Sequence, residues 1–588
     1  MIKLNRQNFR GPWAGLPVPR DAHSRFDGTG RRTISIPNPM TRIRALLASQ
    51  ALSFAVVAAG ANADRHLFHL IGIGAPAAPK ALLLAIDERA FPLRDNLALF
   101  ITKPVVRAKP VLGASTSPDA PDNVGASFYG TVLHEGGRFR LWYYSHYATD
   151  AEGGIRAGPV CYAESADGVN WTRPNLGQLE WHGSRANNAI ALGNKTESIE
   201  GVYVIREDDD PLPERRYKMV YYYFGETPRY PGSEPRGIRL AVSRDGLRWT
   251  RLPGEVTGGK FAELSSLYRH NGLYFVHSHI HGHGADDRPE GRQGYAWVSA
   301  DFDHWLTESA PSLRVSEPLV GSGYGTHSDE RKGIGLYTQD HEGIGAVSFG
   351  NVVVGLWGMW RQREPNWGEG GINADLGLVV SEDGFHFDEV VKGQPFITSA
   401  ESPADPVPGR HYPTILTVGN GILDVGDETL IYHSRWRNVA FQKLGMSKND
   451  GTNVAKDYWS GIALARLPRD RWGALALSGK EKAGSAWTAG VRLADSSVLT
   501  INGSGLAGLR VDVADERFQT LPGYGEGRTP GSANDAFGAE VGWAGRTLRE
   551  IAGKTVRFHL RFFRSAAADP RLFALNLIRQ PGTAAPGG

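Results

Sequence analysis

Carboxylates stand beside apolar segments at three places in the chain, and paired carboxylates can do acid–base chemistry. Asp122 precedes the run FYGTVL, Glu200 abuts the apolar run in ESIEGVYVI, and Glu263 stands among apolar neighbours in KFAELSSLYRHNG. A carboxyl group among apolar residues has a raised pKa, which suits a proton donor. A second carboxylate could attack or activate water, and such a pair is what cleavage of a glycosidic bond requires. Asp122 is therefore the candidate base or nucleophile, and Glu263 the candidate general acid.

Other acids near these segments compete for the same roles. Asp119 lies three residues before Asp122, and Glu197 lies shortly before Glu200. The run Asp208–Asp210 follows its apolar segment and is itself followed by proline, which is typical of a solvated hairpin loop. Each of these carboxylates could equally be a surface or turn-capping group.

Polar and aromatic side chains that could hold a ligand stand at the ends of other apolar segments. Four histidines alternate between residues 277 and 283, so on a strand they would share one face, a spacing that could hold a metal. The glycines that follow indicate that the strand is ending, and we expect a polar pocket wall there and no metal. Sugar rings pack on aromatic rings, and the aromatic candidates are Trp357, Trp360, Trp367 and Trp436. The residues that we expect to bind substrate are His279, Trp360, Arg361, His433 and Arg435.

A seven-residue phrase recurs along the chain, each time after an apolar strand. Its copies are SADGVNW at 165–171, SRDGLRW at 243–249, SADFDHW at 299–305 and SEDGFHF at 381–387. Asp-Gly predicts a tight two-residue turn, in which glycine supplies a positive φ, and the aromatic residue opens the next strand. A degenerate fifth copy at 460–472 keeps the strand and the tryptophan.

A second recurring segment, rich in aromatic residues, lies upstream of each phrase. Its five copies occupy residues 136–146, 214–224, 271–281, 352–362 and 427–437. Together the two elements describe a unit of four antiparallel strands that repeats five times. The sequence therefore predicts an all-β fold with a five-bladed β-propeller over roughly residues 110–475.

These segments resemble a known superfamily, the glycoside hydrolases with a five-bladed propeller, which includes families 32, 43, 62, 68 and 130. The stretch YAESADGVNWTRPNLGQLEWHGSRANNAI at 162–190 and the run DPLPERRYKMV at 210–220 are most similar to bacterial family-32-like members. LADSSVLTINGSGLAGLRVDVAD and IAGKTVRFHLRFF in the tail resemble the β-sandwich that follows such propellers. The resemblance implies a third carboxylate that orients the sugar, and it assigns this role to Glu200.

The chain departs from the family-32 pattern in its motifs. Trp-x-Asp-Pro-x-Gly, Arg-Asp-Pro and Glu-Cys are absent, and Val160 precedes the single cysteine, Cys161. The seven-residue phrase also resembles the sialidase Asp-box, but it lacks the residue that separates Asp from Gly in that motif. Sialidases have six blades and an arginine triad, so a sialidase-like hydrolase is the less favoured alternative.

The first 63 residues have the pattern of a leader. Met40 begins a short basic segment, followed by the apolar block ALLASQALSFAVVAAG and then Ala61-Asn62-Ala63, which is typical of a secretory signal peptide cleaved before Asp64. This leader carries a net charge of +7, so the remainder of the chain carries −4 and lacks the basic surface that nucleic acid requires. One cysteine cannot form an internal disulfide, and a buried place on its strand is the simplest role for Cys161.

We therefore expect three segments: a leader at 1–63, a propeller with an N-terminal lead-in at 64–478, and a β-sandwich at 479–580. The expected function is that of an exported glycosidase, periplasmic or secreted, without a cofactor. Its partner would be a carbohydrate, with no nucleic acid and no membrane span, and the protein would be a monomer. The alternative is a carbohydrate-binding propeller without catalysis.

Export predicts that the leader is removed. N-terminal sequencing of protein isolated from the native cell envelope should begin near Asp64. Material that keeps residue 1 after export would exclude cleavage at this site.

Overall fold

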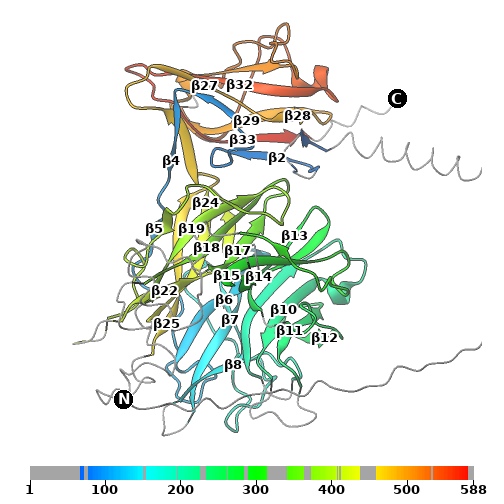
Figure 1. The fold of residues 1–588 in the computed structure, drawn as a ribbon, viewed down its shortest axis with the longest axis vertical. Helices are drawn as coiled ribbons and strands as arrows, with labels where there is room; N and C mark the ends of the chain where they lie inside the picture. The colour runs from blue at the N-terminus through cyan, green and yellow to red at the C-terminus, as the bar shows by residue number, and fades with distance from the viewer. Residues whose placement is uncertain are drawn as a thin grey trace, which may run out of the picture. The chain divides into compact units, whose positions relative to one another are not determined.

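The computed structural model describes the chain from residue 67 to residue 580 with internal gaps (Figure 1). The described ranges are 67–71, 74, 77–149, 154–194, 197–225, 234–260, 262–283, 289–313, 341–362, 372–406, 408, 412–437, 458–531 and 534–580. Residues 63–588 form one compact unit, and residues 1–62, which hold most of the expected leader, lie outside the described part. The described chain is all-β, with only short 3-10 helices, as the sequence predicts.

Three antiparallel sheets follow one another along the chain, and each contains one of the predicted repeats. The first contains β6 (Gly125–Glu135), β7 (Arg138–Thr149) and β8 (Gly154–Ser165). The second contains β9 (Ile199–Arg206), β10 (Tyr217–Tyr223), β11 (Gly237–Ser243) and β12 (Trp249–Arg251). The third contains β13 (Glu263–His270), β14 (Leu273–His283), β15 (Pro289–Ser299) and β16 (Ala310–Pro311).

The last two predicted repeats are joined into one ten-stranded sheet. Ala374 on one repeat pairs in parallel with Ile415 on the next. The strands are β17 (His341–Ser348), β18 (Val353–Gln362), β19 (Ile372–Ser381), β20 (Asp388–Glu389), β21 (Pro395–Ile397), β22 (Thr414–Thr417), β23 (Ile422–Val425), β24 (Glu428–Arg437), β25 (Ser460–Pro468) and β5 (Val105–Val106). Strand β5 pairs with β25, so an early segment completes the sheet formed by the last repeat. We refer to residues 105–468 as the repeat region.

The recurring phrase forms a capped five-residue loop, which corrects the predicted two-residue turn. Ser243 pairs with Trp249 across the second copy, leaving five residues between them. In the first copy, the Ser165 hydroxyl accepts the N–H of Gly168 at 2.9 Å, and one Asp167 oxygen accepts the N–H groups of Val169 and Asn170, each at 2.8 Å. The aspartate holds the loop by the same side-chain capping that closes Asx turns.

Three of the four loops present a glycine carbonyl to a side chain on an adjacent sheet. The Trp142 indole on β7 donates to the oxygen of Gly246 at 2.8 Å, and the Tyr268 hydroxyl on β13 donates to Gly384 at 2.7 Å. The Tyr432 hydroxyl on β24, in the last repeat, donates to Gly168 in the first repeat at 2.8 Å. The same chemistry therefore joins neighbouring repeats and also joins the last repeat to the first.

The first strands of the repeats pack against one another in chain order: β6 against β9, β9 against β13, and β13 against β17. Asn420, just before β23, connects this series. Its backbone exchanges hydrogen bonds of 3.0 Å with Gly130 and Val132 on β6. Its side chain exchanges hydrogen bonds with the backbone of Leu267 on β13 at 2.5 and 3.3 Å. Asn420 thus joins three repeats, β6 through its backbone and β13 through its side chain.

Two six-stranded sheets face each other across a separate apolar core, which includes Leu83, Leu499 and Leu560. The first sheet contains β1 (His69–Ile71), β3 (Leu93–Asp95), β27 (Ala483–Trp487), β28 (Gly490–Arg492), β30 (Leu509–Ala514) and β32 (Thr555–Phe563). The second contains β2 (Ala81–Leu84), β4 (Leu97–Ile101), β26 (Gly473–Leu477), β29 (Ser497–Ser504), β31 (Asp535–Glu540) and β33 (Arg571–Arg579).

This pairing differs from the expected boundaries at 64–478 and 479–580. The lead-in strands β1 to β4 pair with strands of the tail, for example Leu83 with Leu575, and β26 also lies in a tail sheet. The lead-in strands pair with strands far away in the sequence, so their position in the chain does not show to which sheet they belong. We refer to 69–101 together with 473–579 as the two-sheet region.

Within the described residues, no helix is long and apolar enough to cross a membrane.

The Tyr432 contact can be tested by removing one hydroxyl group. Tyr432→Phe leaves the Gly168 carbonyl with only the Trp171 indole of its own phrase as a donor, so the loss should be that of one net hydrogen bond, about 0.5–1.5 kcal/mol, with a lower unfolding midpoint. Tyr147→Phe is the matched control, because no hydrogen bond of the Tyr147 hydroxyl is found within the described residues. Equal midpoints for the two variants in thermal unfolding would contradict the role given to this contact.

Candidate active site

Glu263 lies at the first position of β13 and is held by a histidine from the next strand. His279 on β14 is its cross-strand partner, and the two side chains meet with Nε2 2.9 Å from Oε2. The Glu263 side chain is 17% exposed and that of His279 is 4% exposed. Opposed cross-strand side chains lie close enough to interact directly. The carboxyl is therefore fixed in orientation while part of it stays open to solvent.

Glu200 lies near the start of β9, the strand that packs against β13. It is half-buried and pairs across the sheet with Tyr222. The hydroxyl of Tyr203, also on β9, donates to the oxygen of Leu264 at 3.2 Å, one residue after Glu263. This hydrogen bond connects the beginnings of the strands that carry the two carboxylates.

Glu200 and Glu263 both lie close enough to two buried tyrosines, Tyr144 and Tyr203, to affect the pKa of each hydroxyl. Burial raises the pKa of Tyr144, and the negative charges of Glu200 and Glu263 raise it further. The pKa of Tyr203 is raised by the same three causes. The structure therefore brings together two of the three predicted catalytic residues.

An aromatic cluster lies on the same face of β7. The ring centroid of His146 is 4.1 Å from that of Tyr144, 5.0 Å from that of Tyr458 and 5.9 Å from that of Trp436. The Trp436 indole donates to the Ser127 hydroxyl at 2.7 Å. Burial lowers the pKa of His146 to about 3, so its ring is neutral at ordinary pH. Of these residues, the sequence analysis singled out Trp436; the alternating aromatics in LWYYSH were the available signal for Tyr144 and His146.

Asp122 lies apart from this pair. It is fully buried, and one of its oxygens is 2.7 Å from Arg173 Nε and accepts the Tyr143 hydroxyl at 2.7 Å. Tyr143 and Tyr144 are adjacent on β7, so their side chains point to opposite faces of the sheet. The expected role of Asp122 as base or nucleophile has no support in this placement, because an enclosed ion pair cannot reach a sugar.

The predicted substrate-binding residues of β24 are also interior. The His433 ring is fully buried, with Nε2 2.8 Å from the Ser402 hydroxyl, and burial lowers its pKa to about 3. Arg435 is 1% exposed and donates to the carbonyls of Pro403 at 3.2 Å and Ala108 at 2.8 Å. Both side chains stabilise the repeat region. The side chains of Trp360 and Arg361 lie outside the described part, as do those of the last two alternating histidines.

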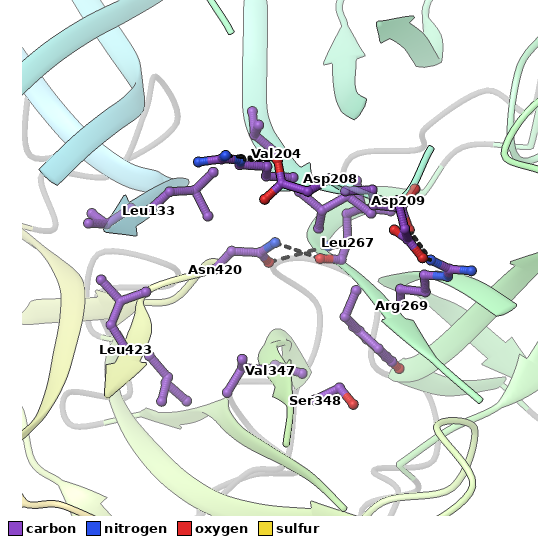
Figure 2. A pocket seen from close by; sticks show the side chains of 17 residues that line it. Leu133, Val204, Asp208, Asp209, Leu267, Arg269, Val347, Ser348, Asn420 and Leu423 are labelled. Atoms are coloured by element: carbon purple, nitrogen blue, oxygen red, sulfur yellow. Dashed lines mark hydrogen bonds and ion pairs between the residues drawn. The ribbon is translucent and has the colours of Figure 1, made fainter. Parts of the chain in front are cut away.

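The other acidic residues that the sequence offers for these roles, Asp119, Glu197, Asp208 and Asp209, lie elsewhere in the structure. Asp119 is exposed, and Glu197 is half-buried just before β9, where burial raises its pKa to about 7. Asp208 and Asp209 border a cavity of about 340 Å³ (Figure 2).

The cavity in Figure 2 lies at the far ends of the first strands from Glu200 and Glu263. It is lined by the later residues of β6, β9, β13 and β17, and Asn420 contacts Leu267 beside it. Most of its lining is apolar, and Arg269 on its edge is paired with Glu207 at 2.7 Å. The carboxylate pair is thus a separate feature from this cavity. The described residues contain no group of three or more His, Cys, Asp or Glu that could hold a metal ion.

No protein-family model matches the chain, and no curated protein is significantly similar to it in sequence. Solved structures align with the chain at low identity. A structure from the GH130 family, described as containing glycoside hydrolases that target beta-1,2 mannosidic linkages in Candida mannan, is 14% identical, covers 62% of this chain and 93% of that chain, and has a TM-score of 0.36. A glycosyl hydrolase from Bacteroides ovatus is 14% identical, covers 62% of this chain and 94% of that chain, and also has a TM-score of 0.36.

A third structure is an N-acetylgalactosamine deacetylase from F. plautii in complex with blood group B trisaccharide. It is 13% identical, covers 63% of this chain and 96% of that chain, and has a TM-score of 0.36. Because these TM-scores lie below 0.5, the similarities do not by themselves establish the fold or the activity of this chain.

The placement of Asp122 predicts a structural phenotype for its removal. Asp122→Asn leaves Arg173, which is 25% exposed, without its charge partner. Breaking a buried ion pair in this way should cost about 3–5 kcal/mol, visible as a lower thermal midpoint. The double variant Asp122→Asn/Arg173→Gln should recover part of this loss. An unchanged midpoint combined with lost activity would return Asp122 to the catalytic candidates.

Proposed function

We propose that the protein is an exported glycoside hydrolase in which the repeat region is a five-bladed β-propeller and the two-sheet region is an accessory β-sandwich. The ordered packing of β6, β9, β13 and β17 supports the propeller. So do the contacts from Asn420 to β6 and from Tyr432 to Gly168, because both join the last repeat to the first. The leader pattern at 1–63 supports export to the periplasm or the medium.

The observation that carries the proposed function is the pairing of Glu200 and Glu263 around Tyr144 and Tyr203. Both carboxylates are partly open, lie within the first two residues of strands that pack together, and have charges that raise the pKa of the same two tyrosines. Hydrolysis of a glycosidic bond needs two such groups on either side of the bond.

Glu263 is the proton donor in this proposal. The contact with His279 fixes the carboxyl, and in the protonated form this group would give its proton to the leaving oxygen. Glu200 then takes the role that the sequence suggested for Asp122: it attacks the anomeric carbon or activates a water molecule. The neighbouring aromatic side chains offer the apolar faces on which sugar rings pack.

Removal of either carboxylate tests this assignment. Glu263→Gln and Glu200→Gln keep shape but remove acid or base, so each should lower turnover by roughly 10²-fold or more with little change in thermal midpoint. Purified protein would first be screened on aryl arabinosides, xylosides, fructosides, galactosides and mannosides. Glu308→Gln, which changes an exposed glutamate of the repeat region, is the matched control. Unaltered rates in both variants would show that other groups perform the reaction.

A carbohydrate-binding propeller is the second candidate. The separation of Asp122 from the pair favours it, since only two of the three expected carboxylates meet. Binding of an oligosaccharide without turnover of any glycoside in the same panel would support this candidate over the enzyme.

A further inference from the structure

The two-sheet region contains a hollow of about 690 Å³ that is distinct from the Glu200 and Glu263 pair. It lies against the segment between β2 and β3, with the end of β1 and part of β32 at its edge. Its charged lining in the described residues consists of Arg89, Arg94, Arg557 and Glu88. Three guanidinium groups thus face the same space as one carboxylate.

The charge of Arg89 is already balanced. Its two terminal nitrogens lie 2.9 Å from Glu382 and 2.6 Å from Asp388, both in the repeat region. Arg89 therefore forms one wall of the hollow without being free to bind a ligand strongly.

The positive charge of Arg94 has no carboxylate as close as those that pair with Arg89. Its closest carboxylate is Glu88 at 4.0 Å, and the side chain of Glu88 is 81% exposed whereas that of Arg94 is 17% exposed. Burial lowers the pKa of Arg94, and the charges of Glu88 and Asp87 offset this only in part. Arg94 also donates to the backbone carbonyls of Phe91 at 3.0 Å and Asp87 at 3.5 Å, so its nearby acceptors are mainly neutral carbonyls.

Arg557 on β32 has no ion pair within the described residues. One terminal nitrogen donates to the Thr488 carbonyl at 3.1 Å, and the guanidinium lies 4.7 Å from the ring centroid of Phe518. Its Nε atom is buried and has no hydrogen-bond partner within the same residues. Because this Nε atom has no exposed surface, a ligand in the hollow would be attracted by the positive charge of Arg557 and not by this donor.

The size and the flanks of the hollow indicate the class of ligand. Its volume lies in the range of sites for small organic ligands and far exceeds a single inorganic anion. Ile71, which is 46% exposed, and Pro92 add apolar surface beside the arginines. Guanidinium groups match carboxylates in a bidentate geometry. Since the chain without its leader carries −4, this preference for an anion is local rather than a property of the whole surface.

We propose that this hollow binds the carboxylate of an acidic sugar, a uronate unit of a glycan, through Arg94 and Arg557. Such a site would hold an acidic glycan on the two-sheet region, away from the carboxylate pair. The inference goes beyond the proposed function, since binding here does not require that Glu200 and Glu263 cleave anything.

Calorimetry on the full protein tests the proposal with trigalacturonate as the probe. Arg94→Gln and Arg557→Gln should each weaken binding about tenfold or more, the loss expected for one charge-assisted hydrogen bond. Arg557→Lys keeps the charge but not the fork, so it should bind less tightly than wild type but more tightly than Arg557→Gln. Arg248→Gln, at an exposed arginine of the repeat region, should leave binding unchanged. Thermal midpoints of all variants are recorded so that unfolding is not read as lost binding.

Two comparisons decide the outcome. Uncharged galactotriose and inorganic sulfate should bind at least tenfold more weakly than trigalacturonate; equal binding of sulfate would reduce the site to a general anion site and overturn the proposal. Glu263→Gln should bind trigalacturonate as wild type does, so failure of the catalytic assignment is distinguishable from failure of this one. Unchanged binding in both arginine-to-glutamine variants would also overturn it.

Discussion

One hydrogen bond to a loop carbonyl is the contact on which the arrangement of the repeats depends. Each seven-residue phrase uses Ser and Asp side chains to satisfy its own N–H groups, as Ser165 and Asp167 do. In three copies the glycine carbonyl also accepts a hydrogen bond from an adjacent sheet, donated by Tyr432, Trp142 or Tyr268. Because each such bond forms only when the loop meets its donor, the repeat favours one register between neighbouring sheets. This is a physical reason for the chain to contain the same phrase four times.

That register determines where functional groups can meet. Strands that pack side by side bring their first residues to one end, and Glu200 and Glu263 stand at these positions on β9 and β13. The Tyr203 hydroxyl joins the two strands at that level, and His279 holds Glu263 from the adjoining strand. Asn420, just before β23, contacts Leu267 further along β13 and lines the cavity of Figure 2. The strands β9 and β13 therefore carry the two carboxylates near their first residues and line the mostly apolar cavity with their last residues.

The sequence predicts the all-β class and the repeated strand unit because period-two alternation and turn chemistry are local signals. It places Glu200 and Glu263 correctly beside strand starts, since that position is also local. It does not show that Asp122 is fully buried, because its charge partner, Arg173, lies 51 residues away. It also misses the pairing of β2 with β33 and the interior location of Arg435, which donates to the distant carbonyl of Ala108. In each case the decisive partner is remote in the chain, and no local pattern reports it.

The surroundings of each carboxylate in this protein indicate whether it stabilises the fold or is a candidate for catalysis. Asp122 is enclosed with Arg173 and serves the fold. Asp87 and Glu382 are both buried, and burial with the charge of Asp87 raises the pKa of Glu382. Arg89, beside Asp87 in the lead-in, pairs with Glu382 and so connects the lead-in to the repeat region. Glu200 and Glu263 are both only partly buried, and the His279 ring holds Glu263 in place. A carboxylate that must exchange protons with a ligand needs partial exposure and a partner that does not neutralise it permanently. The environment, rather than the residue type, therefore distinguishes the candidate catalytic acids from the structural ones.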